Sequence, residues 1–300
     1  MRVGVIGLGA MGLGAARSCL AAGLETVGCD INPAARAAFQ AAGGEAVGAP
    51  DAMGALDAVL VLVVNAAQTD AALFGEGGLA AALPKGAVVL ASATTPPDYP
   101  PKLAERLAAL GLLFLDAPVS GGAAKSALGE LTIMASGPAA AFDKAAPLLD
   151  AISEKVYRIG DAPGQAAAIK MINQLLAGVH IAAMAEAFAL AARAGADLNT
   201  VYEVISNAAG GSWMFQNRGP SIVSGDYAPK SAVDIFVKDL GIVLDAGRTF
   251  TFPLPLAAAA HQQFLAASAG GHGRENDSAV IKVFQKLTGI ALPEQAGDKA

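Results

Sequence analysis

Three glycines near the N-terminus, Gly7, Gly9 and Gly12, stand between an apolar strand and a helical segment. In this context the first glycine permits a tight turn, the second lets the backbone approach a pyrophosphate, and the third lets the helix pack on the strand. The free amides at the start of the helix then face the phosphates. A second strand, residues 26–29, ends in Asp30, at the spacing where a carboxylate binds ribose hydroxyls. The pattern predicts a dinucleotide site.

The charge of Asp30 favours NAD over NADP, because a carboxylate repels a 2′-phosphate. Residues 31–33 offer no arginine to receive such a phosphate, and the nearest one, Arg36, lies further along the chain. The alternative is a glycine turn in an ordinary α/β protein, which the combination of strand, helix and acid disfavours.

A lysine that could exchange protons, Lys170, lies inside a strongly apolar helical segment, with Asn173 and Gln174 one turn further on. Residues three and four apart share a helix face, so either amide could bind the same ligand oxygen as the ammonium, or orient it. Partial desolvation lowers the pKa of a lysine toward the range where it exchanges a proton with an alcohol. The alternative is a structural lysine whose ammonium reaches solvent along the helix surface.

Residues 116–122, Asp-Ala-Pro-Val-Ser-Gly-Gly, follow an apolar strand at the expected carboxyl edge of a sheet, where open α/β folds bind ligands. Ser120 and the amides of Gly121 and Gly122 could form a nest for a carboxylate. A plain strand-to-helix turn is the alternative.

Two further segments have both a functional and a structural interpretation. Lys238 and Asp239 are expected to open a helix, where an aspartate usually serves the helix dipole. Thr95 is expected to cap a helix whose first residue is Pro96.

Short Val/Leu/Ile runs alternate with Ala-rich helical stretches over about the first 160 residues, and the pattern then becomes entirely helical. Continuous apolar strands predict an α/β fold, with a Rossmann-type doubly wound parallel sheet followed by an all-helical domain. The expected boundaries are 1–162 for the nucleotide domain, 163–292 for the helical domain and 293–300 for a polar, disordered tail. Later strands are expected at residues 58–64, 87–91, 112–115, 132–136 and 156–159, and helices at 165–193, 198–208, 235–249, 254–267 and 279–288.

Composition narrows the possible partners and compartment. The chain has 300 residues, 54% of them apolar and 15% charged, and its net charge of −6 includes no basic block, so nucleic acid and anionic membranes are not expected as partners. Cys19 and Cys29 are too few for a disulfide framework, which favours a reducing cytoplasm, and no metal site is expected.

The apolar N-terminus is interpreted as a strand rather than a signal peptide. Residues 172–192 are long and apolar enough to suggest a membrane span, but His180 and Glu186 interrupt them, which favours a buried helix.

Four segments resemble, in order, the signature blocks of the β-hydroxyacid dehydrogenase family, the 3-hydroxyisobutyrate dehydrogenase-like group. They are residues 7–12, residues 116–122, the helix with Lys170 and Asn173, and the pair 238–239. The resemblance extends from Arg2 to about Gly289. It implies a Rossmann domain, an all-helical domain, NAD(P), a small anionic hydroxy acid as substrate, and homodimers or homotetramers built around the long helix.

The resemblance also implies a role for each matching residue. Lys170 corresponds to the catalytic lysine, which takes the hydroxyl proton in oxidation and returns it in reduction. The other matching residues would bind substrate (Ser120, Gly121, Gly122, Asn173, Gln174, Asp239 and Thr95) or cofactor (Gly7, Leu8, Gly9, Ala10, Met11, Gly12, Asp30, Val64, Asn65, Thr95 and Lys238). Some members carry asparagine at the fourth residue after the lysine and others at the third, so the choice between Asn173 and Gln174 stays open.

Within the family, residues 210–218 and 225–241 are most similar to members that oxidise the 2-hydroxyl of L-threonate with NAD. Ser212, Gln216 and Asn217 would suit a substrate with several hydroxyls. The alternatives are reduction of tartronate semialdehyde or glyoxylate, and oxidation of 3-hydroxyisobutyrate. A catalytically silent nucleotide-binding scaffold would not need Lys170 with Asp239, and imine reductases typically lack the lysine.

Overall fold

The computed structural model describes residues 1–228 and 231–294 and divides the chain into two compact units, residues 1–171 and residue 172 onward. The division falls inside one continuous helix, α7 (Gln165–Arg193), so the expected domain boundary at 162/163 stays a prediction. Of the expected tail, residues 295–300 lie outside the described residues.

The first unit is built on one sheet of mostly parallel strands, with the order β3-β2-β1-β4-β5-β6-β8-β7, and β9 paired to β8. β1 pairs with β2 on one side and with β4 on the other, so the strand order reverses at β1. This is the topological switch point at which doubly wound folds bind nucleotides. β8 pairs antiparallel with β6 and β7, a reversal that the expected parallel sheet lacked. The strands are β1 (Arg2–Ile6), β2 (Glu25–Cys29), β3 (Glu45–Val47), β4 (Ala58–Val61), β5 (Val88–Ala91), β6 (Leu113–Asp116), β7 (Val119–Ser120), β8 (Leu131–Ser136) and β9 (Ser153–Gly160).

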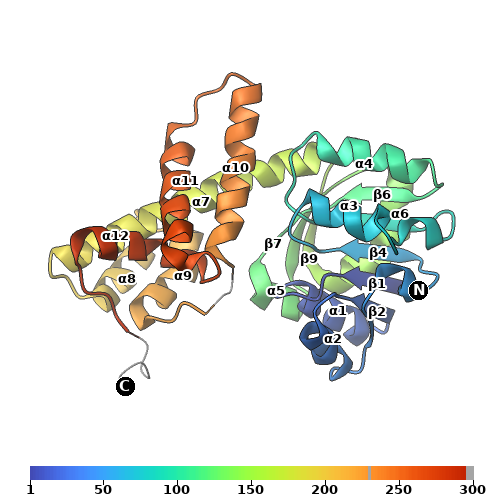
Figure 1. Ribbon diagram of the computed structural model, residues 1–300, viewed down its shortest axis with the longest axis horizontal. Helices are drawn as coiled ribbons and strands as arrows, with labels where there is room; N and C mark the ends of the chain where they lie inside the picture. Colours follow the sequence, from blue (N-terminus) through green and yellow to red (C-terminus); the bar gives the residue numbers. More distant parts are fainter. Residues whose placement is uncertain (229–230, 295–300) are drawn as a thin grey trace. The chain divides into compact units, whose positions relative to one another are not determined.

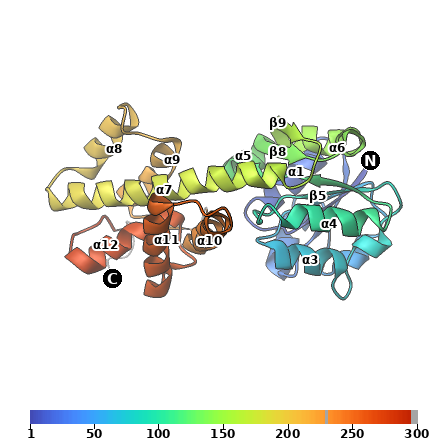
Figure 2. The ribbon, with the colours of Figure 1, turned by 90° about the horizontal axis from the view of Figure 1, so that it is seen from above.

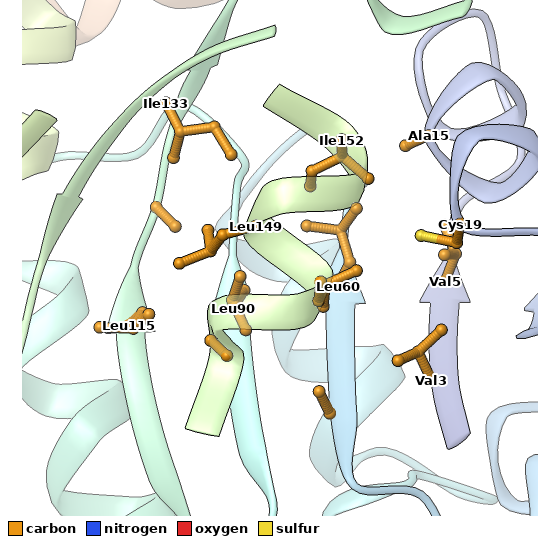
Figure 3. Packing of buried hydrophobic residues seen from close by; sticks show 14 of the residues in the cluster. Val3, Val5, Ala15, Cys19, Leu60, Leu90, Leu115, Ile133, Leu149 and Ile152 are labelled. Carbon is orange, nitrogen blue, oxygen red and sulfur yellow. The ribbon is translucent and has the colours of Figure 1, made fainter. Parts of the chain in front are cut away.

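The central strands are apolar on both sides because helices cover both faces of the sheet (Figure 2). In β4, for example, Leu60 belongs to one buried cluster and the neighbouring Val61 to the other, since successive side chains alternate between faces. Figure 3 shows Leu149 and Ile152 of one covering helix lying over Leu60 and the adjacent strands. This two-sided burial fixes the strand ends, and therefore the loops that carry the candidate site.

The helices of the first unit connect the strands, as Figure 1 shows. One expectation was wrong: no helix begins at Pro96 with Thr95 as its cap. Pro97 would be the second residue of that helix and has no N–H to be capped, and a turn closed by Tyr99 N–H to Pro96 O precedes the helix. The helices are α1 (Gly12–Ala21), α2 (Pro33–Gln40), α3 (Ala66–Phe74), α4 (Tyr99–Ala108), α5 (Gly122–Leu128) and α6 (Ala139–Ile152), with 3₁₀ turns at Pro50–Met53 and Ala80–Ala82.

The described residues of the second unit form helices and connecting loops, with an isolated bridge between Ala232 and Asn276. Lys238 and Asp239 do not open a helix as expected. The helix begins earlier, at Val233, and Asp234 takes the acidic position in its first turn. The elements are α7, shared with the first unit, α8 (Leu198–Ser206), α9 (Trp213–Ser224), α10 (Val233–Thr249), α11 (Pro255–Ala267) and α12 (Ile281–Thr288), with short helical turns at Ser268–His272 and Asp277–Val280.

Among the described residues, α7 is the one helix long and apolar enough to cross a membrane by length and composition. Ile181, Ala185 and Phe188 in its second half are fully buried in the second unit, and Phe188 stacks on Phe215 with ring centroids 5.1 Å apart. The second half of α7 therefore contributes to the hydrophobic core of the second unit.

Candidate dinucleotide and hydroxy-acid site

Two of the three glycines in the turn after β1 are sterically required, and the third borders open space. Gly7 has φ +92°, and a Cβ there would lie 2.6 Å from the Leu62 carbonyl oxygen. A Cβ at Gly12 would lie 1.7 Å from the Gly7 carbonyl oxygen, so α1 packs directly on the turn. A Cβ at Gly9 would meet no atom within 4 Å, which leaves open space where a pyrophosphate would approach the backbone.

The start of α1 lies beside this open space. Met11 is its N-cap residue, and no side chain caps the helix. Ala10 is exposed and Met11 half-buried, so this end of the helix is accessible. An accessible helix N-terminus with no side-chain cap suits a phosphate group.

Asp30 lies next to the glycine turn, at the end of β2. Its Oδ2 accepts a hydrogen bond from Leu8 N (2.7 Å), and its Oδ1 accepts one from Asn32 N (2.7 Å). Each carboxylate oxygen keeps a second lone pair that can accept a ribose hydroxyl. Arg36 folds back to this point, and its guanidinium donates to the carbonyl oxygens of Asp30 (2.7 Å) and Ile31 (3.0 Å). Two backbone carbonyls thus hold the Arg36 guanidinium beside Asp30. Its position six residues further along the chain did not indicate this proximity.

Val64 and Asn65 follow β4, on the other side of the switch point. Asn65 Oδ1 accepts from Gln68 N (2.9 Å), and Gln68 Oε1 accepts from Val64 N (2.9 Å), so the two polar side chains cap α3 reciprocally. The Val64 side chain is 46% exposed. The turns after β1 and β4 therefore present glycine backbone, a helix start and an apolar side chain, a set that fits a dinucleotide.

The loop after β6 contains two consecutive residues with positive φ, Gly121 at +126° and Gly122 at +72°. Ser120 precedes them at the end of β7 and is half-buried. A Cβ at Gly121 would lie 2.9 Å from the side chain of Lys125, which forms an exposed ion pair with Glu154 (2.8 Å). L side chains rarely adopt these φ values, so both glycines are needed for the loop.

Lys170 is buried in the first unit, with 7% of its surface exposed. The helix that carries it, α7, begins one residue after Gly164, which has φ +98°. A Cβ at Gly164 would lie 2.5 Å from the Pro97 carbonyl oxygen. The start of α7 therefore touches the loop of Thr95, whose side chain is also buried.

A buried carboxylate binds the start of α7. Oδ2 of Asp116, the last residue of β6, accepts hydrogen bonds from Gly164 N and Ala167 N, both at 2.9 Å. Ser136 Oγ donates to the same oxygen (3.3 Å) and accepts from Ala166 N (3.0 Å). Burial raises the pKa of the Asp116 carboxyl, against the opposing effect of these donors.

Sequence reasoning treated Asp116 only as part of its loop and did not consider Ser136. A signal was present: Pro163 and Gly164 precede α7, and neither side chain can accept a hydrogen bond from the helix amides. A helix whose first amides are buried and have no local cap needs an acceptor from elsewhere in the fold.

In the second unit, α7 and α10 bring four polar side chains together. Asn173 Nδ2 donates to Gln174 Oε1 (2.9 Å), and Gln174 Nε2 donates to Asp239 Oδ2 (2.5 Å). Lys238 pairs with the other oxygen of Asp239, Oδ1. Gln174 and Asp239 are buried, with 8% and 1% of their surfaces exposed, whereas Asn173 is half-buried. Both ends of the Gln174 amide are therefore hydrogen-bonded within the protein.

Close helix packing makes this network possible. A Cβ at Gly178, one turn after Gln174, would lie 3.0 Å from the side chain of Leu240, the residue after Asp239. The glycine therefore lets α10 approach α7 closely enough for Gln174 to reach Asp239.

The polar side chains expected to line a substrate wall each have a structural partner in the second unit. Ser212 caps α9 by accepting from Phe215 N (3.0 Å), and Gln216 Nε2 donates to Ser206 O (2.9 Å). Asn217 accepts a hydrogen bond from Arg218. The choice of substrate must therefore rest on other observations. No group of His, Cys, Asp and Glu that could hold a metal ion was found in residues 1–228 and 231–294.

Two protein-family models match the chain, one on each part. Residues 2–160 match the NAD binding domain of 6-phosphogluconate dehydrogenase, and residues 164–284 match the model described as NAD-binding of NADP-dependent 3-hydroxyisobutyrate dehydrogenase. The two matches meet at the start of α7.

Similar proteins match over almost the full length. The L-threonate dehydrogenase of Cupriavidus necator is 58% identical over 98% of both chains, and that of Haemophilus influenzae is 54% identical over 98% of this chain and 97% of the relative. The crystal structure of a Salmonella typhimurium protein described as 3-hydroxyisobutyrate dehydrogenase has a TM-score of 0.90 and 54% identity, covering 94% of this chain and 99% of that one.

Proposed function

The chain belongs to the 3-hydroxyisobutyrate dehydrogenase-like family of NAD(P)-dependent hydroxyacid dehydrogenases, and on that premise we propose that it oxidises L-threonate with NAD. The observation that carries the substrate is the 58% identity to an L-threonate dehydrogenase over 98% of both chains. The carboxylate of Asp30 at the expected ribose position supports NAD over NADP.

When bound, NAD accepts the hydride that leaves the carbinol carbon of the substrate. For this cofactor we propose the residues at the switch point: the 7–12 turn for the pyrophosphate, Asp30 for the ribose, and Val64, Asn65 and Thr95 for the remainder. The open space at Gly9 and the uncapped start of α1 support this assignment. Lys238 is proposed as a further cofactor-binding residue.

In the proposed mechanism, Lys170 Nζ takes the proton from the hydroxyl group that is oxidised. Its burial supports this role, because a lysine is rarely buried in a protein without a partner or a function. Ser120 and the amides of Gly121 and Gly122 would hold the substrate carboxylate. The positive φ values of the two glycines, which L side chains rarely adopt, support a special backbone conformation at this point.

Of the two neighbouring amides, we propose Asn173 as the one that binds substrate. It lies three residues after Lys170 and thus on the same face of α7. Gln174 and Asp239 would hold Asn173 in position, because the buried Gln174 side chain is hydrogen-bonded to Asn173 at one end and to Asp239 at the other. Asp239 would then act on the substrate through this chain of hydrogen bonds.

The oligomeric state and compartment are also proposals. Leu176 and Leu190 of α7 are 50% and 70% exposed, which is unusual for a helix this apolar and supports burial against another copy in a homodimer or homotetramer. Cys19 and Cys29 are free and buried, and burial raises their pKa values to about 12 and about 11. Unreactive free thiols are compatible with the cytoplasm. We keep 1–162 and 163–292 as the functional domains.

The proposed substrate predicts a clear order of rates. NAD reduction is measured side by side with L-threonate, D-threonate, D-glycerate, L-serine and 3-hydroxyisobutyrate, and repeated with NADP. We expect kcat/KM for L-threonate to exceed that for 3-hydroxyisobutyrate by about 100-fold or more, because a site that binds hydroxyl groups rejects analogues lacking them.

A second candidate substrate is 3-hydroxyisobutyrate, because the Salmonella protein described as 3-hydroxyisobutyrate dehydrogenase is 54% identical to this chain. A preference for 3-hydroxyisobutyrate would replace L-threonate as the substrate and leave the reaction type unchanged. Fast NADH consumption with glyoxylate or tartronate semialdehyde, together with slow oxidation of all the hydroxy acids, would identify a reductase instead.

Asp30→Ala is expected to lower the preference for NAD over NADP by at least about tenfold, because it removes the charge that repels a 2′-phosphate. Arg36, bound to two neighbouring carbonyl groups, would then be the nearest cation to that phosphate. The ratio of kcat/KM values for the two cofactors is the measurement, and Glu76→Ala, which changes an exposed acid, is the matched control. An unchanged ratio in Asp30→Ala would exclude the ribose role.

A further inference from the structure

The lysine helix is anchored by a residue that belongs to a different strand. Asp116 ends β6, and its Oδ2 binds the amides of Gly164 and Ala167 at the start of α7. Asp116 is 2% exposed, so water does not compete for these hydrogen bonds. The carboxylate thus performs the function of an N-cap that no residue before α7 supplies.

Ser136 completes this cap from the neighbouring strand, β8. Its hydroxyl is fully buried, donates to Asp116 Oδ2 and accepts from Ala166 N. Three amides in the first turn region of α7 therefore have acceptors fixed to the sheet. Because the last of them, on Ala167, is three residues before Lys170, the cap sets both the position and the direction of the helix one turn from the lysine.

The same end of α7 is sterically fixed. Gly164 has φ +98° and no room for a Cβ beside the Pro97 carbonyl oxygen. The helix start is thus bound on one side by Asp116 and Ser136 and limited on the other by the Thr95–Pro97 loop. The start of α7 can therefore shift only if the hydrogen bonds to Asp116 and Ser136 are lost.

We propose that Asp116, with Ser136, is a positioning residue for catalysis, which holds α7 so that Lys170 meets the reacting hydroxyl. This inference rests on the proposed function. It assigns Asp116 no contact with substrate or cofactor, and it separates the role of Asp116 from that of the carboxylate loop that follows it in sequence.

The test compares Asp116→Ala, Asp116→Asn and Ser136→Ala with the wild-type full-length enzyme. We expect Asp116→Ala to lower kcat by about 10- to 100-fold, the scale of a misplacement near 1 Å, with NAD affinity unchanged. Asp116→Asn retains an oxygen acceptor and should restore most of kcat, and Ser136→Ala should show a smaller loss. The primary deuterium isotope effect on kcat should rise in Asp116→Ala, because the chemical step becomes more rate-limiting.

A readout independent of activity is amide hydrogen exchange at residues 164–167, which should accelerate in Asp116→Ala. Thr26→Ala, which removes a different buried hydroxyl of the same sheet, is the control and should change neither kcat nor exchange at these amides. If Asp116→Ala does not fold, kcat and amide exchange are compared between the wild type, Asp116→Asn and Ser136→Ala.

Faster exchange with unchanged kcat would overturn the positioning role, and unchanged exchange would overturn the cap. Equal losses of kcat and NAD affinity would show a general structural defect, which also overturns the proposal. A wild-type enzyme that oxidises no hydroxy acid would refute the proposed function and the catalytic half of this inference, whatever the exchange data show.

Discussion

Lys170→Ala is expected to lower kcat for hydroxy-acid oxidation by at least about 100-fold, the usual contribution of general acid–base catalysis. The affinity for NAD should stay close to the wild-type value, since the glycine turn and Asp30 belong to other elements of the fold. Steady-state kinetics give kcat, and titration calorimetry gives the dissociation constant of NAD.

Lys170→Arg distinguishes proton transfer from simple charge. The guanidinium keeps the positive charge but does not lose its proton in proteins, so a general base is lost as fully as in the alanine variant. Lys85→Ala, which removes an exposed lysine, is the control and should retain wild-type kcat. Substantial activity in Lys170→Arg, or parallel losses of kcat and NAD affinity in Lys170→Ala, would argue against the proton-transfer role.

Features specified by short stretches of sequence were predicted well. The bounds expected for α7, Gln165 and Arg193, agree with the structure, because Gly164 and Gly195 flank a mainly apolar stretch that contains no proline. The steric requirements for Gly7 and Gly12 were also predicted, since both arise within the turn and the start of α1, whereas the role of Gly9 toward the pyrophosphate stays a prediction. The family itself followed from the order of four such local segments and is confirmed.

Features that depend on distant residues were missed. The expected helix start at Pro96 failed for a local reason instead, because Pro97 has no N–H for Thr95 to cap and a turn from Pro96 to Tyr99 precedes the helix. Sequence spacing left Asn173 and Gln174 equivalent, and the difference between them comes from Asp239, 65 residues beyond Gln174. The cap of α7 joins Asp116 to amides 48 and 51 residues away, a distance that no motif encodes.

A buried ion pair in the second unit has the same long-range character. Arg218 of α9 binds Asp277 through Nε–Oδ1 (2.6 Å) and Nη2–Oδ2 (3.2 Å), although the residues are 59 positions apart. Asp277 is fully buried, and Arg218 is 8% exposed. The short helical turn that carries Asp277 packs against α10, the helix of Lys238 and Asp239. The pair therefore stabilises the scaffold of the polar network.

Arg218→Ala is expected to lower the free energy of unfolding by about 3–5 kcal/mol, because Asp277 would remain as a buried carboxylate without a counter-charge. The measurement is urea denaturation followed by circular dichroism at 222 nm. The matched control is Arg248→Ala, which breaks an exposed ion pair with Asp245 and should change stability by less than about 0.5 kcal/mol. A double variant, Arg218→Met with Asp277→Leu, should be less destabilised than Arg218→Ala, since it leaves no unpaired charge.

The loss of stability in Arg218→Ala is expected to depend on pH. Burial already raises the pKa of Asp277 above its ordinary 3.8, while Arg218 opposes that shift, so the variant pKa rises further. A native state that binds a proton more tightly than the unfolded state loses stability as the pH rises from 3.8 through the raised pKa. The deficit of Arg218→Ala relative to wild type should therefore be smaller at acidic than at neutral pH. A deficit that is independent of pH would mean that lost packing of the arginine stem, rather than the unpaired carboxylate, causes the destabilisation.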